Sequence, residues 1–315
     1  MAQLPYLLCY LAFVSFTVTV VARCVMWSSL PMHVRWELYP IPHEPPGKAR
    51  YGGSFMENTD WWSQPRKISR MGEAKAMIPE ILLLSAVRAH NRQLWARTFP
   101  FHLGLYLAGA AVGLALLAGI SNAVAPTLLV GTARALVQRG VLVLGVAGLA
   151  LGCIGSLLLL LRRLTEPALK AFTVPADIFN LLFFAVAFSS GLLTFALVDR
   201  NADRAWAFAA NLTSFNMVAL PGTGIESILP TTTVVLLSLL IAYVPLTHMS
   251  HFVGKFFAYH AIRWNDDPNL AGGPQEAQIE RQLAYKVSWA ADHIRGQGEK
   301  TWADVATQNP TEVKK

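Results

Sequence analysis

Three histidines stand at the ends of two apolar stretches of the chain. His102 lies near the start of FHLGLYLAGAAVGLALLAGI, and His248 and His251 close the stretch LPTTTVVLLSLLIAYVPLTHMSHF. His248 and His251 are three residues apart, so they share one face if the helix continues through them. Imidazole is a common metal ligand near neutral pH, which makes these side chains candidate ligands for a cofactor held between membrane helices. The alternative is a set of interfacial histidines solvated by lipid headgroups.

The composition of the chain is that of an integral membrane protein. Hydrophobic residues make up 54% of the 315 residues and charged residues only 14%, whereas soluble domains carry about 25% charged residues. The mean hydropathy is +0.40. The net charge of +7 is therefore interpreted through membrane topology and not as a nucleic-acid footprint.

The cysteines and short motifs exclude several kinds of site. Cys9, Cys24 and Cys153 lie in or beside apolar runs, and there is no CxxCH for a covalent c-type haem. Without a CxxC or a cysteine cluster, we do not expect an iron–sulfur cluster bound by this chain alone. HExxH, GxGxxG and P-loop motifs are also missing from the sequence.

Five apolar segments are long enough to span a bilayer, so we expect an all-α, five-helix transmembrane bundle. The predicted organisation is a first span within 1–27, a loop with an amphipathic helix at 28–98, four further spans within 99–265 and a tail at 266–315. Arg23 and Arg35 follow the first span and no basic residue precedes it. We therefore expect a retained helix and not a cleaved signal peptide. The spans are predicted at 4–27, 99–120, 137–161, 175–198 and 229–251.

The distribution of Lys and Arg predicts the orientation of the bundle. The 28–98 loop, the 162–170 loop and the tail hold most of the basic residues, whereas the loops on the other side hold few or are neutralised. By the positive-inside rule, the N-terminus is periplasmic, and the 28–98 loop and the C-terminus are cytoplasmic. We expect a multi-pass protein of the cell inner membrane.

Two cytoplasmic segments have helical patterns with an apolar side. From 67 to 97 the pattern predicts an amphipathic helix, which either lies on the membrane surface, carries another subunit, or does both. A second helix is expected over about 275–295. Its apolar stripe either contacts a partner or packs onto the 28–98 loop. The first stripe comprises Met71, Ala74, Ile78, Ile81, Leu82 and Val87, and the second Ile279, Leu283, Val287 and Ile294.

The predicted topology brings histidines from two spans to one side of the membrane. His102 enters from the cytoplasmic side in the second span, and His248 and His251 leave on that side at the end of the fifth. A bis-histidine haem b held between two helices needs this arrangement. Lys255, Arg263 and Arg97 lie near the same surface and are candidates to contact haem propionates. The alternative is coincidence among eight histidines.

The remaining histidines are expected to be solvated or structural. They lie in the first loop, in the amphipathic segment and in the tail, where nothing in the spacing points to a ligand. They are His33, His43, His90, His260 and His293.

The histidine motifs carry a resemblance to a known family. FHLGLYL around His102 and PLTHMSHF around His251 resemble the haem-binding helices of the gamma subunit of respiratory nitrate reductases. They also resemble the cytochrome b subunits of the Dsr- and Tmc-type transmembrane redox complexes of sulfate-reducing bacteria. WELYPIPHE, YGGS and DWW in the first loop look most like the Tmc-type branch.

This resemblance implies a cofactor set. His102 and His251 would be the axial ligands of one haem b on the cytoplasmic side, and hence the ligands of its iron. The nitrate reductase relatives hold a second haem, but its ligand positions are Val112 and Thr233 here, so we expect only one. His248 is an extra histidine that would bind a quinone or a propionate, or serve as an alternative ligand. Lys255, Arg263 and Arg97 remain quinone or propionate candidates.

The resemblance also implies a function and partners. The chain would be the membrane cytochrome b subunit of a respiratory complex, an oxidoreductase subunit that passes electrons between membrane quinone or menaquinone and a cytoplasmic iron–sulfur partner through haem b. The expected partner is a heterodisulfide reductase-like subunit, and a periplasmic cytochrome c and other membrane subunits are further candidates. No nucleic acid is expected. The alternative is a small transporter or a non-redox membrane anchor subunit.

Overall fold

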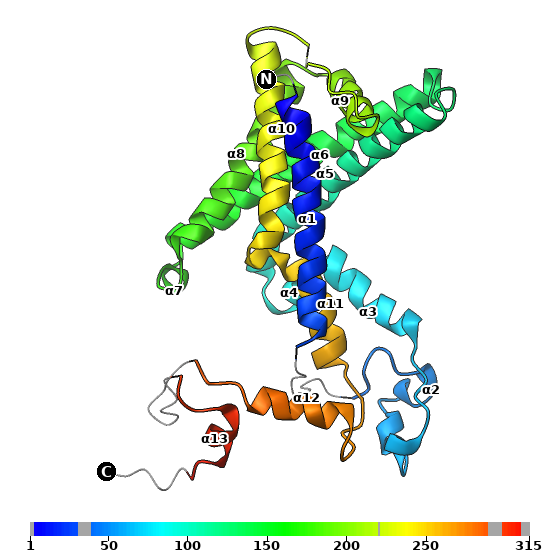
Figure 1. Cartoon of the computed structure of the whole chain (residues 1–315), viewed down its shortest axis with the longest axis vertical. Helices are drawn as coiled ribbons and strands as arrows, with labels where there is room; N and C mark the ends of the chain where they lie inside the picture. The colour runs from blue at the N-terminus through cyan, green and yellow to red at the C-terminus, as the bar shows by residue number, and fades with distance from the viewer. Residues whose placement is uncertain (1–2, 31–38, 220, 289–297, 310–315) are drawn as a thin grey trace. The chain divides into compact units, whose positions relative to one another are not determined.

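The computed structural model of the protein describes residues 3–30, 39–219, 221–288 and 298–309, and within these ranges it is all-α. Five described helices are long and apolar enough to cross a membrane, so the predicted multi-pass, five-helix fold is confirmed (Figure 1). They are α1 (Leu4–Ser28), α5 (Arg92–Val124), α6 (Gly131–Thr165), α8 (Pro175–Leu197) and α10 (Ile225–Tyr243), the last span continuing to Leu246.

Shorter helices connect and extend these spans. Between α1 and α5 lie α2 (Pro46–Ala49), α3 (Arg70–Leu82) and α4 (Ser85–His90); α7 (Pro167–Lys170) follows α6, and α9 (Asp203–Thr213) follows α8. After α10 come 3-10 turns, α11 (His251–Phe257), a π-helical turn (Ala258–Arg263), α12 (Pro274–Leu283) and α13 (Trp302–Thr307).

The chain forms two compact units. The bundle unit comprises Met1–Thr19 and Ile78–His248, and the cluster unit comprises Val20–Met77 and Met249–Lys315. Helices α1 and α3 contribute residues to both units. The two units differ in what holds them together, and each is described separately below.

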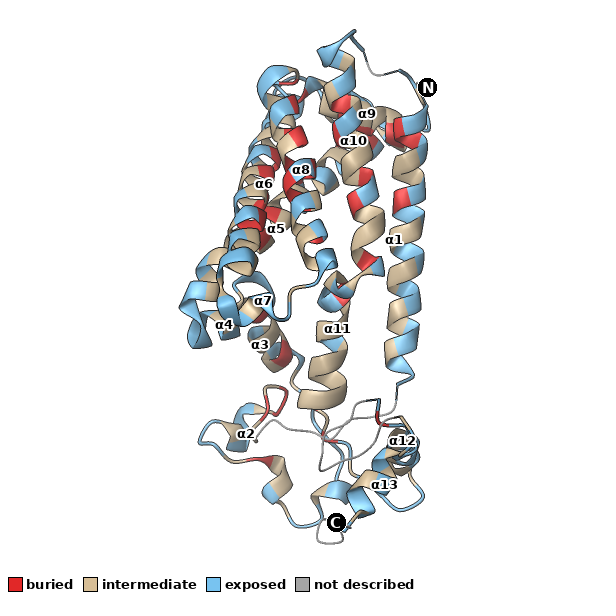
Figure 2. Cartoon of the chain, turned by 90° about the vertical axis from the view of Figure 1, so that its left-hand side faces the viewer, coloured by how far each residue is buried: buried red, intermediate tan, exposed pale blue. Residues whose placement is uncertain are grey.

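Glycines bring α5 and α6 into close contact in the bundle unit. A Cβ added at Gly104 would meet the Gly148 carbonyl oxygen at 2.7 Å, and one added at Gly148 would meet the Ala108 Cα at 2.9 Å. The helix backbones therefore touch, as small residues allow in membrane helix pairs. Buried residues concentrate where α5, α6 and α8 face one another (Figure 2).

Polar and aromatic contacts attach the other elements of the bundle unit. The hydroxyls of Thr194 on α8 and Thr233 on α10 are 2.7 Å apart and buried. Tyr243 at the end of α10 donates to Asn180 Oδ1 on α8 at 2.7 Å. The N-terminal half of α1 joins through Tyr10, whose hydroxyl donates to the Leu212 carbonyl of α9 at 2.6 Å.

The segment expected as one amphipathic helix over 67–97 is divided into three. Leu84 adopts a left-handed conformation with φ of 51° between α3 and α4, and Asn91 caps α5 through the Leu94 N–H. The burial of α3 also differs from the expected pattern. Glu73 and Glu80 are buried, whereas Met71 is 66% exposed and Ile78 54% exposed. Hydrogen-bond and ion-pair partners explain why the carboxylates, and not the apolar side chains, face the protein.

The predicted tail helix is shorter than expected. Helix α12 ends at Leu283, and Val287 is buried in an extended segment that pairs with Lys300, whose carbonyl accepts from the Val287 N–H at 2.8 Å. The prediction of a single helical stripe is therefore wrong at Val287. Ile294 lies outside the described residues.

Candidate functional site

His102 is oriented by its own helix. It lies half-buried on α5, about one turn after the apolar part of the helix begins, and its Nδ1 is 2.9 Å from the Thr98 carbonyl oxygen. Because a carbonyl oxygen only accepts, Nδ1 carries the hydrogen in this contact and Nε2 holds the lone pair of the neutral ring. Metal-ligating histidines use such a second bond to fix their tautomer and ring orientation. The donor chemistry of His102 therefore fits a metal ligand.

The face of α5 that carries His102 is distinct from the face that packs on α6. Gly109 and Gly113 follow His102 by two and three turns on the same side. A Cβ added at either position meets no atom of the described residues within 4 Å, whereas one added at Gly104 meets α6. This side of α5 is therefore open beside Gly109 and Gly113.

The fifth span ends before its histidines. Helix α10 ends at Tyr243 and a short 3-10 turn follows at Val244–Leu246, where Pro245 has no N–H to continue the helical hydrogen bonds. His248 lies in a second 3-10 turn and His251 starts α11. The predicted fifth span therefore does not continue as a single helix through both histidines. Both side chains are exposed.

The predicted cationic residues belong to two different local environments. Lys255 and Arg263 both lie over the ring of Tyr259, at 5.8 Å and 4.6 Å from its centroid. Arg97 lies on α5 with its Nη1 3.9 Å from a Glu166 carboxylate oxygen, to which Arg162 also binds at 2.7 Å. Arg97 is thus part of an ion-pair group at the α6–α7 connection.

The two units divide the predicted site residues between them. His102, His248 and Arg97 belong to the bundle unit, and His251, Lys255 and Arg263 belong to the cluster unit. The pairing of His102 with His251 around one haem therefore stays a prediction. Val112, one of the two positions at which the sequence predicts no ligand for a second haem, is 43% exposed, and Thr233, the other position, is bonded to Thr194.

Comparisons of the chain with protein-family models, curated proteins and solved structures found no match. Among the described residues there is also no group of three or more His, Cys, Asp and Glu side chains placed to hold a metal ion. A haem with two axial histidines would not require such a group.

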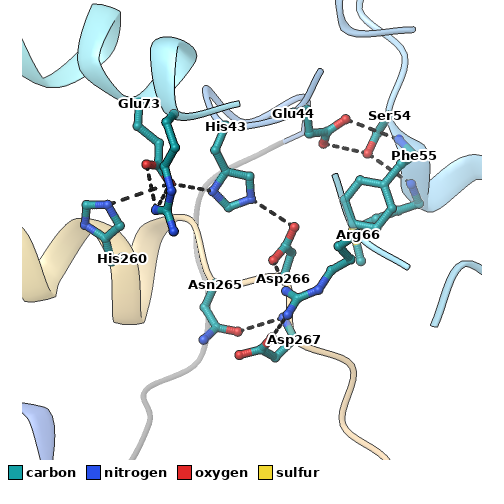
Figure 3. Close-up of polar contacts among 12 residues, drawn as sticks. His43, Glu44, Ser54, Phe55, Arg66, Glu73, His260, Asn265, Asp266 and Asp267 are labelled. Atoms are coloured by element: carbon teal, nitrogen blue, oxygen red, sulfur yellow. Dashed lines mark hydrogen bonds and ion pairs between the residues drawn. The ribbon is translucent and has the colours of Figure 1, made fainter. Parts of the chain in front are cut away.

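The cluster unit contains a buried polar cluster that the sequence interpretation missed. His43 is 6% exposed, and its Nε2 lies 2.9 Å from Asp266 Oδ2 (Figure 3). Arg66 donates to both Asp266 and Asp267. The carboxylate of Asp266 thus joins the loop after α1 to the segment after the π-helical turn, although these parts are more than 200 residues apart in sequence.

A second carboxylate lies on the other side of the same imidazole. Glu73 Oε1 is 3.7 Å from His43 Nδ1 and 3.8 Å from His260 Nε2, and Arg70 donates to Glu73 at 2.9 Å (Figure 3). An imidazole between two carboxylates can donate to both only when it is protonated. His43 was expected to be solvated or structural, and its burial makes it structural; His33 and His293 lie outside the described residues.

Within this cluster, the environment of Asp266 clearly shifts the pKa of its carboxyl group. Burial opposes its ionisation, but the hydrogen bond and charge of His43 and the guanidinium of Arg66 outweigh burial and hold the pKa of Asp266 below its usual value. The carboxylate is therefore ionised at neutral pH and can accept hydrogen bonds from both His43 and Arg66.

Proposed function

We propose that the chain is the membrane cytochrome b subunit of a respiratory complex, and that it passes electrons between membrane quinone and an iron–sulfur partner on the cytoplasmic side. The observation that carries the proposal is His102, an imidazole in a membrane-spanning helix whose Nδ1 is bonded to the Thr98 carbonyl oxygen. A hydrogen bond from the ring nitrogen that does not face the metal is typical of metal-bound histidine. The likeness of both histidine motifs to the nitrate reductase gamma subunit supports the same assignment.

In this proposal His102 and His251 hold one haem b from opposite sides. A haem with two histidine ligands exchanges single electrons, and its surroundings tune its potential. Thr98 keeps the Nε2 of His102 directed away from its own helix. Lys255, Arg263 and Arg97 would bind propionates or quinone, and His248 would exchange a proton with a quinone oxygen.

The proposed topology places the N-terminus in the periplasm and the C-terminus in the cytoplasm of a cell with an inner membrane. The basic residues of the first loop, of the α6–α8 connection and of the tail support it by the positive-inside rule. The cluster unit would then lie on the cytoplasmic side, where the iron–sulfur partner docks.

Difference spectra of the purified protein test the haem directly. We expect a b-type band in the reduced-minus-oxidised spectrum of the wild type, and its loss in both His102→Ala and His251→Ala. His90→Ala is the matched control, because His90 is exposed at the end of α4 and its loss should leave the band unchanged. A protein without the band, or a band that survives either ligand substitution, would favour the alternative of a transporter or non-redox anchor.

A finer experiment separates ligation from folding. Thr98→Val removes the hydroxyl near His102 but leaves the Thr98 carbonyl bond, so the band should persist. His102→Met keeps a possible axial ligand, and the reduction potential of the haem should rise while the protein still binds haem. A potential that does not change in His102→Met would show that this residue is not an axial ligand.

A further inference from the structure

An exposed apolar edge lies on the surface of the bundle unit, between the end of α3 and the start of α4. We call the segment 78–85 the α3–α4 turn. Four of its five large aliphatic side chains are between 39% and 54% exposed, although they are consecutive or one helical turn apart. They are Ile78, Ile81, Leu82 and Leu83. An exposed apolar edge of this kind marks a surface that contacts something other than water.

Two aromatic side chains of α5 hold the turn. Trp95 Nε1 donates to the Leu83 carbonyl at 2.8 Å, and the Tyr106 hydroxyl donates to the Ile81 carbonyl at 2.6 Å. Trp95 also stacks on Phe99 with 4.7 Å between ring centroids. The turn is thus fixed against α5 at two points, so its level along that helix is defined.

The level of these two points places the turn at the edge of the apolar part of α5. The sequence has no charged residue between Arg97 and Arg134. Tyr106 is nine residues inside this stretch, about 13 Å along the helix at 1.5 Å per residue. Side chains point back toward the helix N-terminus, and Trp95 lies just before Arg97. The 81–83 segment is therefore level with the first turns of the span, where hydrocarbon meets the headgroups.

Several polar groups of the turn have partners within the protein. Glu80, only 8% exposed, accepts from the Ser85 hydroxyl and from the Ala86 N–H, both at 2.7 Å. These contacts, and the aromatic bonds to the carbonyls of Ile81 and Leu83, lower the cost of placing these groups in lipid. Exposed basic side chains follow the turn at Arg88 and Arg92, where phosphates would lie.

We propose that the α3–α4 turn inserts into one leaflet of the bilayer and that acyl chains cover its apolar edge. Lipid is the occupant because the edge continues the apolar surface of α5 and lies at the level where that surface begins. Aromatic residues that bond backbone carbonyls at this level are typical of the membrane interface. This inference depends only on the bundle unit and its spans, and not on the presence of haem.

Nitroxide labels on the full chain in lipid nanodiscs test the proposal. The three native cysteines are replaced by Ala, and single cysteines are introduced by Leu82→Cys and Ile78→Cys. Val112→Cys, in the middle of α5, serves as the lipid-facing reference, and Asn201→Cys, in the polar loop before α9, as the aqueous reference. Accessibility to oxygen, which concentrates in lipid, is compared with accessibility to a water-soluble nickel chelate.

We expect the oxygen-to-nickel ratio at positions 82 and 78 to be several-fold higher than at position 201 and to approach that at 112. An oxygen-to-nickel ratio at position 82 equal to that at position 201 would overturn the proposal. The edge would then be exposed to water, either permanently or until a protein partner binds. Labelling at Leu83→Cys guards against local disturbance, since the proposal requires the same result there. The haem spectrum, measured on the same samples, reports separately on the proposed function.

Discussion

The bundle unit and the cluster unit are held together by different forces. In the bundle unit, backbones meet at glycines such as Gly104 and Gly148, and a buried hydrogen bond between neutral groups joins Thr194 to Thr233. In the cluster unit, a buried aspartate binds an imidazole and a guanidinium that come from a distant part of the chain.

This difference is the one expected if lipid surrounds the bundle unit and water surrounds the cluster unit. Lipid gives apolar helices no hydrophobic reason to associate, so close van der Waals contact between small residues must supply the attraction. The loop and tail segments of the cluster unit have few large buried side chains, Trp264 and Val287 being the largest that are fully buried. Charged hydrogen bonds therefore fix the geometry there, and each unit should fail under a different substitution.

The largest expected effect is the loss of the central carboxylate in the cluster unit. Asp266→Asn leaves His43 and Arg66 without their anionic partner, and removal of one member of a buried ion pair costs about 3 kcal/mol. We expect hydrogen exchange in the 39–70 segment to accelerate roughly a hundredfold, measured by mass spectrometry in nanodiscs. Peptides of α5 and α6 should exchange as in the wild type.

Asp267→Asn is the matched control for that change. Asp267 also accepts from Arg66, but its side chain is 48% exposed, so its ion pair should contribute about 1 kcal/mol or less. Equal acceleration in the two variants would show that burial of Asp266 is not what stabilises the cluster.

A smaller effect is expected for a substitution at the helix contact of the bundle unit, and it should destabilise the bundle unit but not the 39–70 segment. Gly104→Ala places a methyl group against the α6 backbone, which must shift, and overpacking of this kind costs about 1–3 kcal/mol. We expect a lower unfolding midpoint in a denaturing-detergent titration, with unchanged exchange in the 39–70 segment. Gly109→Ala, where the added methyl meets no described atom within 4 Å, should unfold at or above the wild-type midpoint.

The smallest effect is the pH dependence of the cluster. Because the pKa of Asp266 is lower in the folded protein than its usual 3.8, its contribution is fully present above that value and is lost as pH falls through the folded pKa. Between pH 7 and 5, titration of Asp266 should therefore leave the hydrogen-exchange protection of residues 39–70 unchanged. The difference between wild type and Asp266→Asn should narrow only below about pH 3.8; narrowing near pH 6 would contradict this account.

The spans were predictable because length and composition suffice to define them. Each needs about 20 apolar residues, and the first and fourth predicted spans differ from α1 and α8 by a single residue at one end. The interruption at the end of the fifth span was visible in Pro245, but the repeated apolar residues around it favoured a continuous helix. The division of 67–97 depends on Leu84, a residue with no preference for a left-handed conformation, and could not be foreseen.

The candidate site was predictable only in part. The two histidine motifs stand out because ionisable side chains are rare in apolar runs. His43, Glu73, Asp266 and Arg66 carry no local signal, since their partners are brought together by the fold of the loop and tail and not by spacing. A histidine in a Pro-rich loop is predicted to be solvated when its carboxylate partners are not known. The Thr98 bond to His102, in contrast, follows from helix periodicity alone.

The separation of His43 from Asp266 along the chain has a consequence for biosynthesis. A ribosome adds about 5–20 residues per second, so His43 emerges roughly 10–45 s before the aspartate 223 positions later that binds it. During that interval four further spans must be inserted while the first loop stays unfinished. The loop is thus exposed to proteases and chaperones until the segment that contains Asp266 has been synthesised.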